Sequence, residues 1–209
     1  MKKICILTSH NPRHIYVANQ LSKIADYSLV ISSAMGLNPA TSYYKNSYST
    51  VMEEYFNQRF LSELSFFNDR SFNLNNQSVI VVGENEINNE YVYEQVKDFK
   101  PDLIIVFGTN ILKGKILSIT SKIINMHLGM SPYFNGSNTN FWPMYQKKYE
   151  YVGVTIHYID AGVDTGNILH QTRALIEKGD SPHSIGNKNI ILGVNSLKNI
   201  IPEILKNDY

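Results

Sequence analysis

Short apolar runs alternate with segments of helical periodicity through the first 127 residues of the chain. The runs lie at residues 2–9, 27–33, 77–83, 102–108 and 122–127. Between them, apolar side chains recur at helical spacing over 14–25, 51–67 and 88–100, and a shorter helix is expected at 110–119. Parallel strands need a crossover connection, which is usually a helix. The alternation therefore predicts an α/β fold with an open, mostly parallel, Rossmann-like sheet that carries helices on both faces.

The last third of the chain follows a different pattern. Residues 151–160 alternate between apolar and polar, which is typical of a half-solvated antiparallel strand, and 167–176 would pair with it. A short helix is expected at 138–148 and a closing helix at 181–206, with Ser181 as its N-cap and Pro182 in its first turn. Residues 36–50 are polar and form either a lid or a surface loop. No boundary divides the chain, so residues 1–209 are predicted to form one domain.

Composition narrows the class of protein. The chain has 209 residues, 43% of them hydrophobic, and a formal net charge of +1. It can bury one core, and it has no charge excess that would attract nucleic acid or a membrane surface. It also lacks a signal peptide and an apolar run approaching the roughly 18 residues of a membrane span, so we expect a cytoplasmic protein. The one cysteine, Cys5, is expected in the core. The last helix or the antiparallel strands could offer an apolar face for a homodimer, although nothing in the sequence fixes the oligomeric state.

Polar side chains stand where open α/β sheets hold their ligands, at the carboxyl ends of strands. Asn125 and His127 end one apolar run two residues apart, so their side chains should point to the same face. An amide donor beside an imidazole suits a reaction in which an oxyanion develops and a proton moves. Asp164, in the glycine-bracketed turn 160–166, would orient the imidazole and raise its pKa. The alternative is a structural histidine at a strand end and an ordinary Asp/Gly turn.

The same residues carry a resemblance to a known family. Asn125, His127, Pro132 and Gly136, followed by Asp164 in a DTG turn, resemble the pattern of formyltransferases that use 10-formyltetrahydrofolate. That family includes glycinamide ribonucleotide formyltransferase, the catalytic domain of methionyl-tRNA formyltransferase and sugar-nucleotide N-formyltransferases. The fold predicted from the alternation of apolar runs agrees with the fold of this family.

The resemblance implies direct transfer of a formyl group from 10-formyltetrahydrofolate to a primary amine of a small acceptor. Asn125 would donate a hydrogen bond to the oxyanion, His127 would stabilise the oxyanion or move the proton, and Asp164 would orient His127. No metal is implied, and the sequence has no HExxH or CxxC spacing. The resemblance places the folate on two loops, whose backbone amides we expect not to be committed to the sheet. These loops consist of Asn110, Ile111 and Leu112, and of Asp160, Ala161, Gly162 and Val163.

Contacts to the acceptor are less closely defined. Arg13 opens the first predicted helix and could bind an acceptor phosphate there, with a surface arginine as the alternative. Asn138, Asn140 and His157 are candidates for contact with the acceptor, and a solvated strand face is the alternative for His157. Phe141 and Trp142 are expected to pack within their helix rather than to stack on an acceptor.

Departures from the family pattern bear on the identity of the acceptor. The family usually has HPSLLP where this chain has HLGMSP, at 127–132. The glycine-rich phosphate loop of the purine enzyme is missing after the first strand. We also expect no tRNA-binding domain after the last helix. These departures favour a nucleotide-linked amino sugar as acceptor, with glycinamide ribonucleotide as the alternative because the chain length suits that enzyme. A non-catalytic folate- or nucleotide-binding protein would have lost one of the three site residues, and a formate-releasing hydrolase would carry a further N-terminal domain.

Overall fold

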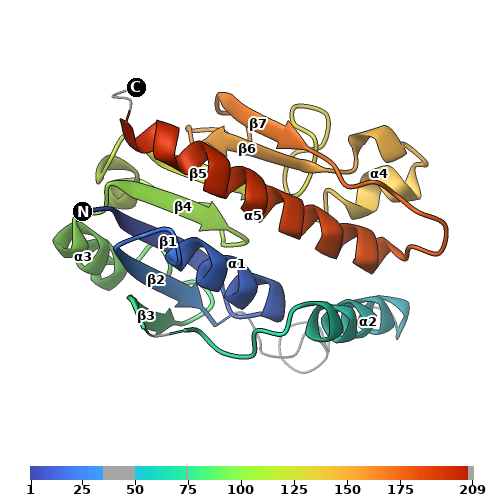
Figure 1. The fold of residues 1–209 in the computed structure, drawn as a ribbon, viewed down its shortest axis with the longest axis horizontal. Coiled ribbons are helices and arrows are strands. Elements are labelled where there is room, and N and C mark those ends of the chain that lie inside the picture. The colour runs from blue at the N-terminus through green and yellow to red at the C-terminus, as the bar shows by residue number, and fades with distance from the viewer. Residues whose placement is uncertain (35–49, 74, 207–209) are drawn as a thin grey trace.

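The computed structural model describes residues 1–34, 50–73 and 75–206, which form a seven-stranded sheet in the order β3-β2-β1-β4-β5-β6-β7 (Figure 1). The strands are β1 (Lys3–Ser9), β2 (Tyr27–Ser33), β3 (Gln77–Val82), β4 (Leu103–Phe107), β5 (Ile123–His127), β6 (Val154–Tyr158) and β7 (Ile168–Thr172). β1 to β5 pair in parallel, and β6 is antiparallel to both β5 and β7. The predicted α/β class and the antiparallel strand pair are confirmed. The polar segment 36–50, for which a lid was considered, lies almost entirely outside the described residues.

The helices are α1 (Pro12–Ser22), α2 (Thr50–Phe66), α3 (Glu90–Phe99), α4 (Phe141–Tyr145) and α5 (Pro182–Lys206), with 3-10 turns η1 (Gly114–Ser118) and η2 (Tyr149–Tyr151). The helix predicted over 110–119 is wrong apart from η1. The residues before η1 are bound to a neighbouring loop instead, since Asn88 donates to the Ile111 carbonyl and accepts from the Lys113 amide. α4 is shorter than predicted because Asn138 and Lys147 flank it in the left-handed region, with φ of 55° and 58°.

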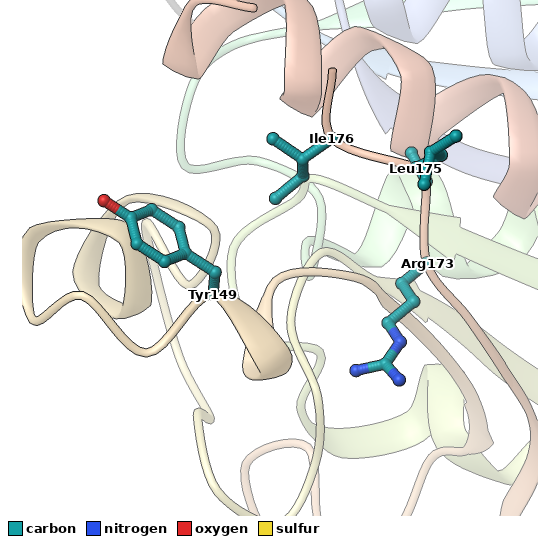
Figure 2. Close-up of a pocket in the computed structure, with 5 residues that line it drawn as sticks. Tyr149, Arg173, Leu175 and Ile176 are labelled. Atoms are coloured by element: carbon teal, nitrogen blue, oxygen red, sulfur yellow. The ribbon is translucent and has the colours of Figure 1, made fainter. Parts of the chain in front are cut away.

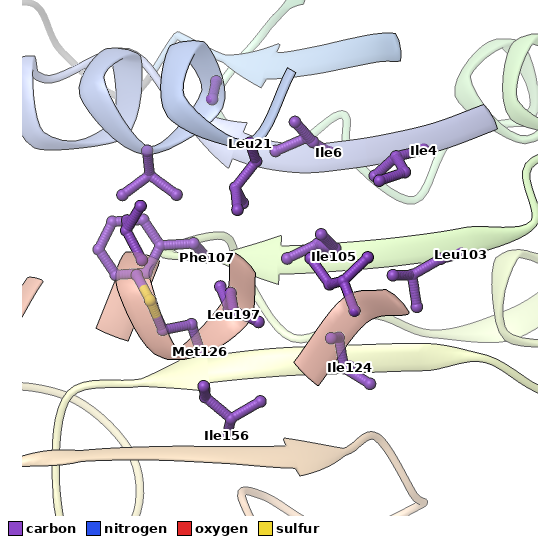
Figure 3. Packing of buried hydrophobic residues seen from close by; sticks show 14 of the residues in the cluster. Ile4, Ile6, Leu21, Leu103, Ile105, Phe107, Ile124, Met126, Ile156 and Leu197 are labelled. Atoms are coloured by element: carbon purple, nitrogen blue, oxygen red, sulfur yellow. The ribbon is translucent and has the colours of Figure 1, made fainter. Parts of the chain in front are cut away.

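Alternate residues of the central strands pack on opposite faces of the sheet. Ile4 and Ile6 join α1 and α5 in one cluster (Figure 3), whereas Cys5 and Leu7 join α3 and η1 in the other. Helices on both faces are therefore confirmed, as is the core position of Cys5, whose thiol has a raised pKa because it is fully buried. No helix among the described residues has the length and apolar character needed to cross a membrane.

β6 departs from the half-solvated strand that the sequence predicts. Its side chains are buried on both faces from Val154 to His157. Val154 and Ile156 pack in the cluster that includes α5. The alternating polar residues, Thr155 and His157, face the other side, where loops rather than solvent cover them. The polar residues of β6 therefore lie in a buried polar region and not on a solvent-exposed strand face. Of the antiparallel pair, β7 is the partly exposed strand, and it lies at the edge of the sheet.

The predicted start of α5 is confirmed by a reciprocal pair of hydrogen bonds. The Ser184 amide donates to Ser181 Oγ at 3.1 Å, and the Ser181 amide donates to Ser184 Oγ at 2.9 Å. Two amides that the helix itself cannot satisfy thus find partners, and Pro182 occupies the first helical position, where its missing N–H costs nothing.

His14 fastens the start of α1 beneath the end of β4. The side chain is 2% exposed, and its Nδ1 accepts from the Asn11 amide at 3.3 Å. Its ring packs against Phe107, with centroids 5.1 Å apart, and a Cβ added at Gly108 would lie 2.3 Å from Nε2. Burial, together with the positive charges of Arg13 and Arg59, holds the pKa of His14 well below its ordinary value.

We predict that His14→Gln flattens the dependence of stability on pH. His14 is neutral in the folded protein, whereas in the unfolded chain it takes up a proton below about pH 6.5. Its contribution to stability is therefore complete above that pH and is lost as the pH falls, at up to about 1.4 kcal/mol per pH unit. Urea unfolding between pH 7.5 and 5 would measure the slope, which does not depend on any constant loss of packing. His170→Gln, which removes an exposed imidazole, is the matched control, and an unchanged slope in His14→Gln would contradict the prediction.

Candidate active site

A cleft of about 1010 Å³ opens where β1, β4 and β5 end. It is lined by the first turn of α1, the segment after β4, the end of β5, the turn after β6 and parts of α2 and α5. The residues predicted for the site all line this cleft: Arg13, Asn110, Ile111, Leu112, Asn125, His127, Asn138, Asn140, His157, Asp160, Ala161, Gly162, Val163 and Asp164. The sequence thus identified a set of residues that the fold brings together from six separate segments.

The turn that carries Asp164 reaches the site by a different route from the one expected. β6 is antiparallel to β5 and pairs Tyr158 with Ile124, and the Ile159 amide donates to the Ile123 carbonyl at 2.9 Å. The turn therefore starts beside the amino end of β5, not at its carboxyl end. It then runs back along one face of the sheet, so that Asp164 contacts the β5 side chains that project from this face.

Asp164 is the centre of the hydrogen-bond network. Its Oδ1 accepts from Asn125 Nδ2 at 3.0 Å and lies 3.4 Å from His157 Nε2. Its Oδ2 accepts from the Gly136 amide at 2.8 Å and lies 3.2 Å from His127 Nδ1. Burial alone would raise the pKa of Asp164, but its close contacts with His157, His127 and the Gly136 amide together bring it below the ordinary value. The carboxylate is therefore ionised at neutral pH.

Backbone conformation explains Gly136 in the sequence pattern. Gly136 has a φ of 93°, a region that side chains rarely adopt, and in this conformation its amide points at Asp164. Asp164 itself has a φ of 53°, which aspartate tolerates better than most residues. Both ends of this contact are thus set by the backbone. The Ser131–Pro132 peptide bond that precedes this loop is cis.

His127 lies between two oxygen atoms. Its Nδ1 faces Asp164, and its Nε2 lies 2.8 Å from the carbonyl oxygen of Phe134. Both partners are acceptors, whereas a neutral imidazole carries one N–H. Neutral His127 can satisfy one of them, and protonated His127 satisfies both. Gaining a proton would therefore strengthen both contacts.

Asp164 acts to raise the pKa of His127, as expected, but the net shift is downward. Burial lowers the pKa below its ordinary value, and the opposing effects of Asp164 and the Phe134 carbonyl offset only part of this, while His157 lowers it further. The side chain is 5% exposed, so desolvation of the charged form outweighs the carboxylate. His127 is neutral in the resting site at neutral pH and is available to accept a proton.

Close packing around His127 accounts for one departure from the family pattern. A Cβ added at Gly129 would lie 2.6 Å from His127 Nε2 and 2.9 Å from the Phe134 carbonyl oxygen. Any side chain at this position would have to displace the loop or the imidazole. The glycine that replaces the serine of the pattern therefore suits the tight loop conformation of this chain.

His157 belongs to the same network and is not on a solvated strand face. It is 2% exposed and pairs with Asn125 across β5 and β6. Its Nδ1 lies 2.8 Å from the Tyr158 carbonyl oxygen, which can only accept, so Nδ1 carries the proton and Nε2 is free to accept. Asn125 Nδ2 lies 3.2 Å from that Nε2. The two hydrogens of the Asn125 amide are thus committed, one to Asp164 and the other to His157.

The two loops expected to hold folate are more ordered than the sequence suggested. Asn110 Nδ2 donates to the Glu84 carbonyl and to Asn85 Oδ1, and Asp160 Oδ1 accepts from the Gly162 amide and from Thr165 Oγ1. The Gly162 amide is thus bound within its own turn and not to the sheet. The amides of Ile111 and Leu112 and of Ala161 and Val163 have no hydrogen-bond partner within the described part of the chain. Ile111 and Val163 are 56% and 44% exposed, so both loops also present apolar side chains.

Two of the residues expected to contact the acceptor already have partners within the protein. The guanidinium of Arg13 is bound to Glu63, so it is not a free cation at the start of α1. Asn140 is 8% exposed, and its Oδ1 accepts from the Gly153 amide at 3.1 Å. Phe141 lines the cleft beside Tyr55, with ring centroids 5.2 Å apart, whereas its neighbour Trp142 is 45% exposed. Both aromatic residues also pack within α4 as expected, since the ring centroids of Phe141 and Trp142 lie 6.0 and 6.1 Å from that of Tyr145.

Glu63 is a residue of the cleft that sequence reasoning missed. It lies within α2 in a segment read only for its helical spacing, and nothing in that pattern shows that a charged residue is buried there. Its pairing with Arg13 joins residues fifty positions apart, which a single sequence does not reveal.

A second, smaller hollow lies away from these residues. It has a volume of about 430 Å³ and is lined by Ala174 and by the labelled residues Tyr149, Arg173, Leu175 and Ile176 (Figure 2). Its one charged group, Arg173, donates to the Glu150 carbonyl. The hollow offers none of the predicted site residues, so the cleft at the strand ends is the candidate site.

Comparison with known proteins agrees with this assignment. The GDP-perosamine N-formyltransferase of Brucella melitensis is 29% identical over 123 residues, which make up 58% of this chain and 47% of that protein. The methionyl-tRNA formyltransferase of a Geobacillus species is 32% identical over 127 residues, or 60% of this chain and 40% of that protein. The matched part of the chain thus covers less than half the length of these relatives.

Solved structures share the fold over nearly the whole chain. The phosphoribosylglycinamide formyltransferase of Anaplasma phagocytophilum superposes with a TM-score of 0.66 at 20% identity, covering 98% of this chain and 87% of that one. A sugar N-formyltransferase from a Shewanella species gives 0.62 at 16% identity, covering 99% and 70%. The sequence model described as formyl transferase matches residues 2–200. The chain belongs to the formyl transferase family.

Proposed function

We propose that the protein transfers a formyl group from 10-formyltetrahydrofolate to a primary amine of a nucleotide-linked amino sugar. The observation that carries this proposal is the Asp164 carboxylate, which contacts both Asn125 and His127 on one wall of the cleft. An amide donor, a neutral imidazole and an ionised carboxylate in contact can together stabilise an oxyanion and move a proton. Family membership supports the reaction type.

The donor would supply an activated formyl group, whose carbon the acceptor amine attacks so that negative charge develops on the formyl oxygen. Asn125 would donate to that oxygen, and His127 would take the proton that the amine loses. Asp164 would then hold protonated His127 through Oδ2, in the contact already present at 3.2 Å. Collapse of the tetrahedral intermediate would break the bond between the formyl carbon and folate N10, and His127 would return its proton to that nitrogen as it leaves. In the resting site the Phe134 carbonyl oxygen contacts His127 Nε2. The acceptor amine would have to displace this carbonyl in order to give its proton to Nε2.

Counting hydrogens adds a role for His157. Asn125 has two amide hydrogens, which go to Asp164 and to His157 Nε2, so neither is free for the oxyanion in the resting site. The proton of the amine goes to His127, so a proton for His157 would come from solvent. With that proton at Nε2, His157 turns from acceptor to donor towards Asp164 Oδ1, 3.4 Å away. That change would release one Asn125 hydrogen. We therefore assign to His157 the task of making the Asn125 donor available.

The folate would bind between Ile111–Leu112 and Ala161–Val163. The unpartnered backbone amides of these residues could hydrogen-bond a pterin ring, and the exposed side chains of Ile111 and Val163 could cover its faces. Asn110 and Asp160 hold the two loops in place, which lowers the ordering cost of binding.

Two observations support a nucleotide-linked amino sugar as the acceptor. The Brucella relative is named for GDP-perosamine. At the start of α1, Pro12 has no amide hydrogen, and the amides of His14 and Ile15 both donate to the Asn11 carbonyl. With Arg13 bound to Glu63, little remains there to hold a terminal phosphate of the kind that glycinamide ribonucleotide carries.

The donor can be tested before the acceptor is known. 5-Formyltetrahydrofolate, a stable analogue of the donor, should raise the thermal midpoint. At about 100 times its dissociation constant it would stabilise the protein by roughly 2.7 kcal/mol, which is a shift of several degrees for a domain of this size. Absence of a shift at high ligand concentration would contradict folate binding.

His127→Ala and Asp164→Ala should lose turnover and keep the folate-induced shift. Acid–base groups typically contribute about 100-fold or more to the rate, and neither side chain is expected to hold the pterin. Mass spectrometry of a panel of amino-sugar nucleotides would detect the added formyl group. The control is Asp98→Ala, which removes an exposed carboxylate from α3. Full activity in either site variant would contradict its assigned role.

Two replacements of His157 should differ in activity. His157→Gln keeps an acceptor for the Asn125 amide but cannot gain a proton, so the donor stays occupied and kcat should fall by about 100-fold, as for loss of an oxyanion donor. His157→Leu frees the amide hydrogen, so kcat should fall less. Comparing kcat at equal folate saturation measures this order, and the reverse order would rule out the proposed release of Asn125.

A further inference from the structure

A buried carboxylate outside the Asp164 network lines the same cleft. Glu63 of α2 is 2% exposed and faces the cleft together with residues of α1 and α5. α2 lies beside α1 and the first part of α5 (Figure 1), so Glu63 stands on a different element from every residue given a catalytic role above. The proposed reaction gives the Glu63 carboxylate no role.

The two oxygen atoms of Glu63 differ in their surroundings. Oε1 is bound by the Arg13 guanidinium, and Arg59 Nε lies 3.7 Å from the same atom. Oε2 is buried and has no hydrogen-bond partner among the residues that the structure describes. A buried carboxylate oxygen is strongly disfavoured unless a donor reaches it. The two arginines thus hold the carboxylate in one orientation, in which one acceptor atom is left for a ligand.

Aromatic rings flank this part of the cleft. Tyr55 packs edge to face on Phe141 at 5.2 Å between centroids, and its ring lies 4.8 Å from that of His183. The Arg59 guanidinium lies over the ring of Phe56, 4.8 Å from its centroid. Rings beside a fixed hydrogen-bond acceptor suit a ligand with an apolar face and hydroxyl groups at its edge, which describes a hexose ring.

We propose that Glu63 is the residue that recognises the sugar of the acceptor, through a hydroxyl group that donates to Oε2. This inference rests on the proposed function. The amine of the acceptor substrate must reach the reacting carbon beside Asn125 and His127. The group that donates a hydrogen bond to Glu63 is therefore a hydroxyl group elsewhere on the sugar. A nucleotide-linked amino sugar supplies such a ring, with hydroxyl groups besides its amine.

The test compares unreactive sugar nucleotides with the nucleoside diphosphates that they contain. The protein is saturated with 5-formyltetrahydrofolate and then titrated with two sets of ligands. The sugar nucleotides are GDP-mannose, UDP-glucose and dTDP-glucose, and the diphosphates are GDP, UDP and dTDP. We expect at least one sugar nucleotide to bind more tightly than its own diphosphate. In Glu63→Gln that sugar-dependent gain should fall by about tenfold or more, as for loss of a hydrogen bond to a charged group, while diphosphate binding and the folate shift persist.

Control variants separate recognition from folding. Glu54→Gln, on an exposed position of α2, should keep the full gain. Glu63→Asp keeps the charge but withdraws it by one methylene, and it should lose the gain even if Glu63→Gln proves unstable. The proposal is overturned if the Glu63 variants bind the sugar as the wild type does, or if no sugar nucleotide exceeds its diphosphate in wild-type protein. Failure of the proposed folate chemistry would appear separately, as a missing shift with 5-formyltetrahydrofolate alone.

Discussion

One carboxylate holds the candidate site together. Asp164 has a contact on each oxygen with a histidine and a second donor, and these four groups come from β5, β6 and the loop that contains Gly136. Because β6 is antiparallel to β5, the turn that carries Asp164 must fold back along the sheet to make these contacts. The antiparallel strand therefore does more than extend the sheet, since it returns a charge to the residues at the end of β5.

The number of hydrogens in this network matters as much as the distances. The two amide hydrogens of Asn125 are both taken, by Asp164 and by His157. Neutral His127 has one N–H hydrogen but lies between two acceptor atoms. Buried networks with such a mismatch can change state when one proton arrives, because every neighbouring bond is then reassigned. A single proton delivered to this site would thus alter which atoms are available to a substrate.

The sequence was a good guide wherever regular periodicity or a spaced pattern carried the information. Apolar runs located each strand of the sheet to within a few residues, and the spacing of Asn125, His127, Gly136 and Asp164 identified residues that meet in space. It failed where tertiary contacts override local preference. Asn88 holds the segment before η1 out of a helix, burial reverses the expected pKa shift of His127, and Glu63 pairs with Arg13 across a long stretch of chain. None of these depends on nearby residues alone.

The site is assembled from parts that should open at different rates. Asn125, His127 and His157 belong to strands hydrogen-bonded on both sides within the sheet, and the backbone of such strands exchanges its amide hydrogens only when much of the molecule unfolds. Asp164 and Gly136 belong to loops, which open locally at far lower cost. Opening of these loops alone would therefore separate the Asp164 carboxylate from Asn125, His127 and His157, while the strands that carry those three side chains stay folded.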